Sequence, residues 1–240
     1  MLPILYRDEH IVAIHKPAGL LVHRSNLARH EERFAVQLLR DQIGRRVYPV
    51  HRLDRGTSGV LVFALDPGMA RTLGEAFMGK AVRKRYLAVV RGHPPAQGEI
   101  DHPLPRIRDD YATAMRSEES PPLQDALTRY RRLATYELPY RVDRYPTSRY
   151  ALLELEPVSG RRHQLRRHLK HISHPIVGDA TYGKGRHNRL FQELFGCRRL
   201  LLACVAMEFA HPLDGETLTL AAPPEGEFAA VIEQLALDCA

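Results

Sequence analysis

The sequence has few cysteines, and this bears on both redox compartment and metal binding. Three occur in 240 residues, none belongs to a C-x-x-C pair, and the count is odd. This pattern argues against a disulfide framework or a zinc knuckle and favours a reducing compartment. The three positions are Cys197, Cys204 and Cys239.

Long apolar runs are also missing. Residues 1–19 include the charged Arg7 and Asp8 and lack the apolar centre of a signal peptide, and no run of membrane length follows. We therefore expect a soluble cytoplasmic protein with no membrane partner.

Acidic residues are outnumbered by basic ones. Lys and Arg total 35 against 28 for Asp and Glu, which gives a net charge of +7 and a pI near 9.5. Such a balance suits a polyanionic partner, although many soluble proteins are mildly basic without one. With 44% hydrophobic residues, the chain can bury a substantial core without disulfides or metal.

Apolar spacing along the chain predicts many strands and few helices, with little strict alternation between them. This favours one α+β domain over residues 1–240, built on a mainly antiparallel mixed sheet. Residues 105–124 are polar and rich in Pro and Ser and should form an exposed loop. The expected strands are 11–14, 20–22, 60–65, 86–90, 126–136, 150–156 and 218–223, and the expected helices are 34–43, 69–78, 162–172 and 228–237.

The densest chemical signal is HRLDRGTSG at 51–59, directly before the apolar run at 60–65. A histidine and two arginines surround Asp54, and positive charge lowers the pKa of a carboxyl group and keeps it ionised. A positioned carboxylate can act as a covalent nucleophile. On residue types alone, a structural Arg–Asp ion pair in a loop is the simpler interpretation.

A second cluster, SGRRHQLRRHLKH at 159–171, predicts a turn followed by a strongly basic helix. Its cations could contact phosphates, and one inward arginine could pair with a catalytic carboxylate. The alternative is a solvated helix face, but such faces usually mix charge signs. His168, His171 and His174 have ligand-like spacing, yet the surrounding positive charge opposes a divalent metal ion.

KRYLAVV at 84–90 begins a strand with two cations and an aromatic residue. Tyr86 could stack on an extruded base. Taken alone, ordinary packing of a tyrosine at a strand start is the more common explanation.

Taken together and in this order, the motifs resemble the RluA-type RNA pseudouridine synthases. The H-R-L-D-x-x-T-S-G and G-R-x-H-Q-x-R strings are each specific for that family. Within it, the sequence is most similar to the TruC type, which modifies uridine 65 of tRNA. The segments that carry the resemblance are DEHIVAIHKPAG at 8–19, HRLDRGTSG at 51–59, KRYLAVVRG at 84–92, SGRRHQLRRHL at 159–169, HPIVGDATYG at 174–183 and HPLDGE at 211–216.

The resemblance implies a pseudouridine-synthase fold and a set of site residues. Asp54 would be the nucleophile, and Arg166 would pair with its carboxylate. Tyr86 would pack against the target base and could help to remove a proton at the end of the reaction. Leu202 would line the pocket, although the family usually has Leu-His-Ala where this chain has Leu202-Ala203-Cys204.

Two arginines complete the implied substrate-binding set. Arg52 would fill the gap left by the flipped base, and Arg55 would help to hold the RNA backbone. Some members of the family carry an added N-terminal S4-like RNA-binding domain, which we expect to be absent because this sequence begins directly in the catalytic segment.

The implied reaction isomerises a uridine and involves no redox change or group transfer, so we expect no cofactor and no metal. The partner would be tRNA, bound by a monomer. The alternatives are a ribosomal RNA pseudouridine synthase of the same family, a non-catalytic RNA-binding protein of the same fold, a glycosidase-like hydrolase with paired carboxylates, and a small-ligand or protein-interaction module. The sequence supplies no obvious second carboxylate motif for the hydrolase.

Overall fold

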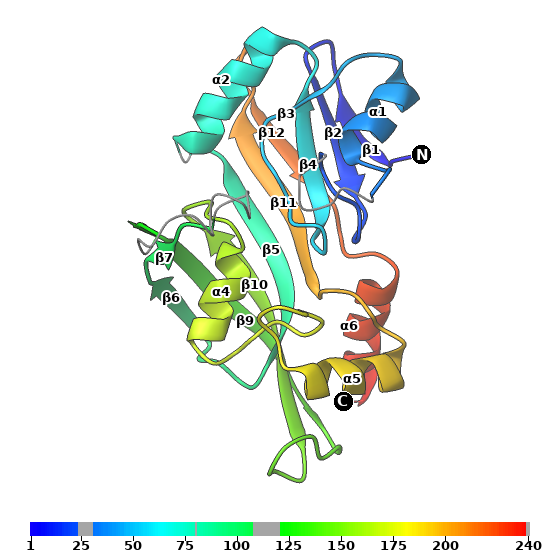
Figure 1. The fold of residues 1–240 in the computed structure, drawn as a ribbon, viewed down its shortest axis with the longest axis vertical. Helices are drawn as coiled ribbons and strands as arrows, with labels where there is room; N and C mark the ends of the chain where they lie inside the picture. Colours follow the sequence, from blue (N-terminus) through cyan, green and yellow to red (C-terminus); the bar gives the residue numbers. More distant parts are fainter. Residues whose placement is uncertain (24–30, 80, 108–120, 239–240) are drawn as a thin grey trace.

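The computed structural model describes residues 1–23, 31–79, 81–107 and 121–238, and it shows a large sheet with helices packed against it (Figure 1). The strands of this sheet are β1 (Ile4–Arg7), β2 (Ile11–Lys16), β3 (Tyr48–Pro49), β4 (Ser58–Ala64), β5 (Arg83–Arg91), β6 (Gln97–Asp101), β9 (Leu127–Leu138), β10 (Ser148–Pro157), β11 (Leu202–Ala210) and β12 (Thr217–Ala221). A separate short ladder joins β7 (Leu104–Pro105) and β8 (Leu123–Gln124). The helices are α1 (Ala35–Ile43), α2 (Pro67–Met78), α4 (Gln164–His171), α5 (Gly185–Phe195) and α6 (Glu227–Asp238).

The strands of the large sheet lie in the order β1-β2-β4-β11-β5-β10-β9-β6, with β12 beside β11 and β3 beside β4. Neighbouring strands are antiparallel except for β4 and β11, which run parallel. A mainly antiparallel mixed sheet, with helices that do not alternate regularly with strands, confirms the predicted α+β class.

The parallel contact between β4 and β11 positions the loop that carries Asp54. Ser58 pairs with Ala203, and Gly59 pairs with Cys204. Gly59 has φ of +110°, and a β-carbon there would overlap the backbone carbonyl of Cys204. Glycine is therefore required at this position, since it alone combines that backbone angle with so close an approach.

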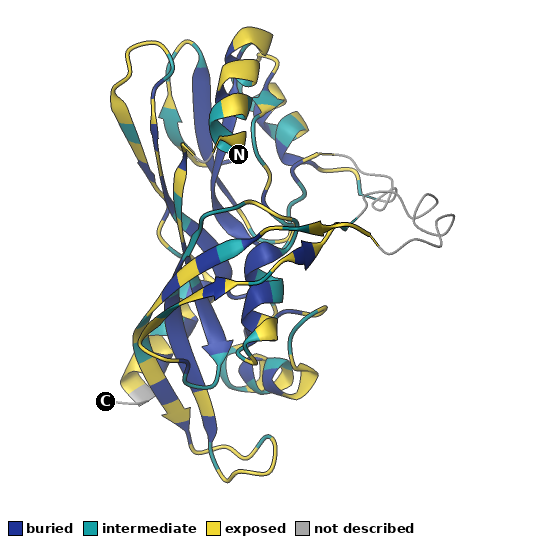
Figure 2. Cartoon of the chain, turned by 90° about the vertical axis from the view of Figure 1, so that its left-hand side faces the viewer, coloured by how far each residue is buried: buried dark blue, intermediate teal, exposed yellow. Residues whose placement is uncertain are grey.

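The central strands are buried on both faces, which explains their continuous apolar runs. Every residue of β2 and β4 is buried, and the buried residues follow the strands through the middle of the molecule (Figure 2). Two clusters of apolar side chains result. Along β11, Leu202 and Cys204 belong to the larger cluster and Ala203 to the smaller, as expected from the alternation of side chains along a strand.

The apolar run at 20–22 is not a strand, contrary to the prediction. Leu21 makes one isolated bridge, to Phe34. The carbonyl oxygens of Leu21 and Val22 instead accept hydrogen bonds from the amides of Ala35 and Val36, at 2.8 and 3.1 Å. Since α1 has no side-chain cap at its first turn, these carbonyls satisfy donors that would otherwise have no partner.

Other boundaries also differ from the prediction. The helix expected over 162–172 is α4, and it begins only after His163. The sequence patterns did not predict β1, β6, β11 or α5. Of the loop expected over 105–124, residues 108–120 lie outside the described part of the chain. None of the helices within the described ranges is long and apolar enough to cross a membrane.

Candidate active site

Asp54 lies on the loop that connects β3 to β4, and a buried lysine anchors this loop. Lys16 donates from Nζ to the carbonyl of Arg55 at 3.3 Å and to two carbonyls of its own turn at 2.8 and 2.9 Å. Gly19 and Arg55 exchange two further hydrogen bonds, of 2.8 and 3.0 Å. Burial lowers the pKa of Lys16 to about 7. The turn that follows β2 is thereby fastened next to Asp54.

Arg166, on α4, holds the carboxylate of Asp54. Its Nη1 donates to Oδ2 of Asp54 at 3.1 Å. The same guanidinium donates from Nε and Nη2 to the two carboxylate oxygens of Asp179, at 2.7 and 2.9 Å. Two-point contact of this kind fixes the plane of a guanidinium group. The structure thus brings together Asp54 and Arg166 as predicted, and it orients the arginine through a residue to which the sequence assigned no role.

Asp179 is almost fully buried and is itself held in place. Its Oδ1 also accepts hydrogen bonds from the backbone amides of Thr181 and Tyr182, both at 2.9 Å. Burial by itself raises the pKa of Asp179, but Arg166 and these amides outweigh it and bring the pKa below its usual value. Burial by itself lowers the pKa of Arg166. The nearby carboxylates of Asp179 and Asp54 outweigh this effect and raise the pKa of Arg166 above its usual value.

His163 is a further site residue that sequence reasoning left without a role. It adopts a left-handed backbone conformation, with φ of 54°, at the residue before α4. Its Nε2 lies 3.8 Å from Oδ1 of Asp54, and its Nδ1 lies 3.0 Å from the hydroxyl of Tyr182. Burial lowers the pKa of His163, against the opposing effect of Asp54. Strained backbone at non-glycine residues often marks functional sites.

A cleft of about 400 Å³ opens beside Asp54 and contains most of the predicted site. The predicted residues in its lining are Arg52, Asp54, Tyr86, Arg166 and Leu202. Arg55 does not line it. That side chain lines a second hollow of about 920 Å³ that also borders Asp54. Arg55 forms an ion pair with Glu31 at 2.5 Å.

Tyr86 forms one wall of the cleft. It sits on β5, is 9% exposed, and pairs in register with Cys204 on β11. Burial, followed by the neighbouring Cys204, raises the pKa of Tyr86 well above its ordinary value. A hydroxyl with such a pKa stays protonated at neutral pH.

The departure from the family's Leu-His-Ala pattern leaves the cleft wall in place. Leu202 is buried and lines the cleft. Ala203 packs in the smaller core, away from the cleft, because neighbouring residues of a strand face opposite sides. Burial raises the pKa of Cys204 to about 12, so its thiol remains neutral beside Tyr86.

His51 belongs to the loop and lines the cleft with Asp54, and contacts with the core fix its ring. Its Nε2 accepts a hydrogen bond from the amide of Val62 at 3.0 Å, and its ring stacks on Phe77 with centroids 4.6 Å apart. Burial lowers the pKa of His51 to about 3. The histidine is therefore neutral, as an acceptor nitrogen must be.

The histidines with ligand-like spacing also have structural partners. Both ring nitrogens of His168 are engaged, by the hydroxyl of Thr128 at 2.9 Å and the carbonyl of His102 at 3.0 Å. His171 stacks on His102, and His174 bonds a backbone carbonyl at the end of β5. In the described ranges, no group of three His, Cys, Asp or Glu side chains could hold a metal ion.

A sequence profile for RNA pseudouridylate synthases matches residues 10–171. That span contains Asp54, Tyr86 and Arg166. The chain belongs to the RNA pseudouridylate synthase family. It is 50% identical over 222 residues to tRNA pseudouridine synthase C of Vibrio vulnificus, covering 92% of this chain and 90% of the relative. It is 47% identical over 234 residues to the protein of the same name from Haemophilus influenzae, covering 98% of both.

Solved structures of the family have the same fold. Human RNA pseudouridylate synthase domain containing 4 superposes with a TM-score of 0.71 at 27% identity, over 98% of this chain and 93% of that one. Human RNA pseudouridylate synthase domain containing 1 gives a TM-score of 0.70 at the same identity, over 93% and 84%. The predicted fold and the predicted pseudouridine synthase activity are thereby confirmed.

Proposed function

We propose that this pseudouridine synthase isomerises a uridine of tRNA, with Asp54 as the nucleophile. The observation that carries the proposal is the arrangement of Asp54 at the cleft, with Arg166 donating to it at 3.1 Å and Asp179 holding Arg166 from the far side. An arginine fixed in this way keeps a carboxylate charged and aimed.

The target base must leave its stack before Asp54 can reach it. The cleft beside Asp54 has the size and lining to receive one base, with the apolar side chain of Leu202 and the ring of Tyr86 as walls. Arg52 is exposed and lines the same cleft. It is therefore placed to occupy the space that the flipped base leaves and to contact the backbone beside it.

Asp54 then attacks either C1′ of the ribose or C6 of the uracil ring. In both routes the bond between N1 and C1′ breaks, and a bond between C5 and C1′ forms after the base has turned. C5 loses its proton, N1 gains one, and Asp54 is released unchanged. Atoms and electrons balance within the substrate, so the isomerisation consumes no co-reactant.

Support for tRNA as substrate comes from the similarity to proteins named tRNA pseudouridine synthase C. The finer proposal is uridine 65 of tRNA, which rests on the TruC-like motifs of this sequence. Such a substrate implies a cytoplasmic enzyme. We also propose that the enzyme acts as a monomer.

The test uses tRNA and ribosomal RNA from cells that lack this protein. Each RNA is treated with wild-type enzyme, Asp54→Asn or Asp54→Ala, and pseudouridine is mapped at single-nucleotide resolution. We expect one new site in tRNA with the wild type and none with either variant. Asp41→Asn is the matched control, because Asp41 is exposed on α1 and pairs with the adjacent Arg40.

The outcomes separate the parts of the proposal. A new site in ribosomal RNA alone would keep the chemistry and replace the substrate. Full turnover by Asp54→Asn would exclude Asp54 as nucleophile. Binding of tRNA without modification by the wild type would identify a non-catalytic RNA-binding protein.

A further inference from the structure

The hairpin between β9 and β10 ends in an exposed tip, residues 139–147, for which the reaction has no use. In Figure 1 it projects past α4 and α5 at the bottom of the view. Its exposed aromatic residues are Tyr140 and Tyr145, which are 43% and 56% exposed. Every other Phe or Tyr in the described ranges is buried or partly buried. Within the described ranges, the exposed tyrosines are therefore confined to this nine-residue tip.

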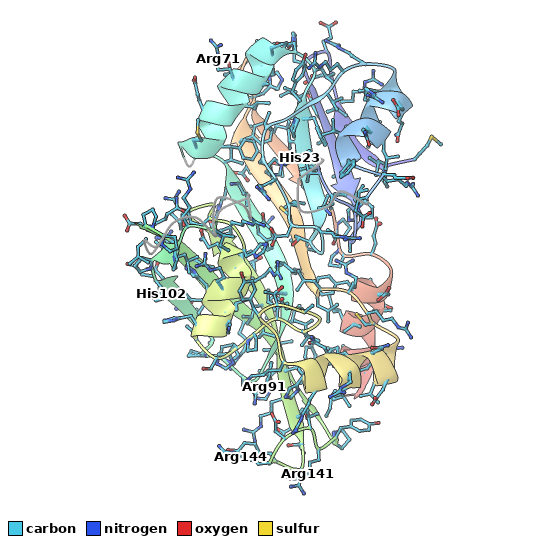
Figure 3. All side chains as sticks on the ribbon, in the orientation of Figure 1. His23, Arg71, Arg91, His102, Arg141 and Arg144 are labelled. Carbon is cyan, nitrogen blue, oxygen red and sulfur yellow. The ribbon has the colours of Figure 1, made fainter. Side chains whose placement is uncertain are left out.

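The same tip carries Arg141 and Arg144, which Figure 3 shows extending from the hairpin end. The guanidinium of Arg144 lies over the ring of Tyr145 at 4.7 Å and donates to its hydroxyl at 2.6 Å. Arg141 donates to the backbone carbonyl of Asp143 at 3.2 Å. Among the described residues, neither arginine forms an ion pair with a carboxylate, so the positive charge of both remains uncompensated.

The acid of the tip is already neutralised. The carboxylate of Asp143 lies 3.4 Å from Arg91 and 3.7 Å from Arg186. Lys184 stands next to α5 and adds further positive charge. The tip and the start of α5 therefore form a surface with a net positive charge, and it is open to solvent.

This surface is connected to the active site through one segment of chain. The segment between α4 and α5 contains Asp179, which holds Arg166, and it leads into α5, whose second residue, Arg186, meets Asp143 of the tip. On β10, Leu155 pairs with Tyr86 of the cleft, and the tip begins at the other end of this strand. The separation along β10 is seven residues, or roughly 23 Å at the rise of a strand.

The tip is also held in shape before any partner binds. Ser148 donates from Oγ to the carbonyl of Tyr140 at 2.6 Å. Thr147 and Arg149 both bond the carboxylate of Glu137, at 2.5 and 3.2 Å. A preformed surface loses less conformational entropy on binding than a flexible one.

We propose that the hairpin tip is a second RNA-binding surface, which binds the tRNA backbone about two thirds of a duplex turn from the target uridine. Uncompensated arginines bind phosphates, and exposed tyrosines stack on ribose or on unpaired bases. A separation of roughly 23 Å is about two thirds of the ~34 Å of one duplex turn. A stem that extends only a few base pairs from the target would be shorter than this and would not reach the tip, whereas a whole tRNA would. This inference rests on the proposed tRNA substrate.

The test compares two RNAs and two matched variants. The RNAs are full-length tRNA and a short stem-loop that carries the target uridine with a few flanking base pairs. The tip variant is Arg141→Glu with Arg144→Glu. The control is Arg45→Glu with Arg71→Glu, which makes the same change in net charge on exposed arginines at the other end of the molecule.

We expect the tip variant to raise KM for tRNA by about tenfold or more, with kcat unchanged. The slope of affinity against salt should fall by about two, one for each lost phosphate contact. KM for the short stem-loop should stay at the wild-type value, as should KM for both RNAs with the control. Arg141→Lys with Arg144→Lys should restore most of the affinity, because the charges remain.

Two results would overturn the inference. An equal rise of KM on both RNAs would show a general electrostatic effect. Unchanged KM and salt slope for tRNA would exclude RNA contact and indicate a protein partner for the tip. Failure of the proposed function is distinct, because the wild type itself would then form no pseudouridine in tRNA.

Discussion

Asp179 grips the guanidinium of Arg166 through two hydrogen bonds, of 2.7 and 2.9 Å. The remaining nitrogen of that group, Nη1, donates to Asp54 at 3.1 Å. One buried carboxylate thus orients the arginine that holds Asp54. An arginine held on one edge has little freedom to turn, so Asp54 has a fixed partner.

Asp179→Asn should therefore lower kcat by about 10- to 100-fold with little change in KM, because misplacing a catalytic group by an ångström has effects of that size. It should also lower the free energy of unfolding by about 3 kcal/mol, since it breaks a buried ion pair from one side. Single-turnover kinetics and urea denaturation measure the two effects. If Asp179→Asn kept wild-type kcat while losing stability, Asp179 would be structural only.

Gly59→Ala should destabilise the protein by more than about 2 kcal/mol, because its backbone angle and the carbonyl of Cys204 leave no room for a β-carbon. The matched control is Gly74→Ala on α2, where nothing lies within 4 Å of the added carbon. That substitution should stabilise the helix by about 0.5–1 kcal/mol. Chemical denaturation measures the unfolding free energy of both variants. If Gly59→Ala and Gly74→Ala changed it by similar amounts, the close approach of β4 and β11 would be refuted.

The half-buried His51 predicts a pH dependence of stability. Its pKa is about 3 in the folded protein and about 6.5 in an unfolded chain. Its contribution is complete above pH 6.5 and is lost as pH falls toward 3, because only the unfolded state then binds the proton. His51→Gln should flatten this dependence by on the order of 1–2 kcal/mol between pH 7 and 5. Urea denaturation at several pH values measures the unfolding free energy of both proteins. If that free energy changed with pH equally in wild type and variant, this role of His51 would be wrong.

RNA affinity should fall steeply with salt, since contacts between arginine and phosphate release counterions. We expect at least about a tenfold loss between roughly 50 and 200 mM monovalent salt. Binding of tRNA to Asp54→Ala measures this without turnover. A flat response would argue against a basic binding surface and would also weaken the role given to the hairpin tip.

Much of the fold and site could be predicted because the relevant signals are local. The continuous apolar runs of β2 and β4 reflect burial on both faces, and the spacing at 34–43 and 69–78 matches helices α1 and α2. The run at 20–22 was wrongly predicted to be a strand because three consecutive apolar residues are also typical of a short strand. In the structure, the carbonyls of Leu21 and Val22 accept hydrogen bonds from the first turn of α1.

Within the site, the residue types of two motifs indicated Asp54 and Arg166, and family resemblance indicated their pairing. The sequence contains no local sign that Asp179 would meet Arg166, since the contact depends on how the segment after α4 folds back. The same holds for His51 and Arg55. Both flank Asp54 in sequence, yet one turns toward β4 and the other into the second hollow.

The sequence by itself determined the α+β class, the family and Asp54 as the candidate nucleophile, because apolar periodicity and two contiguous motifs encode them within short windows. Tertiary structure alone decided that Asp179 orients Arg166, that Ala203 faces away from the cleft, and that the tip at 139–147 presents its tyrosines and arginines to solvent. These features depend on contacts between residues distant in the chain and on which face of the sheet each side chain takes, and a linear pattern carries neither.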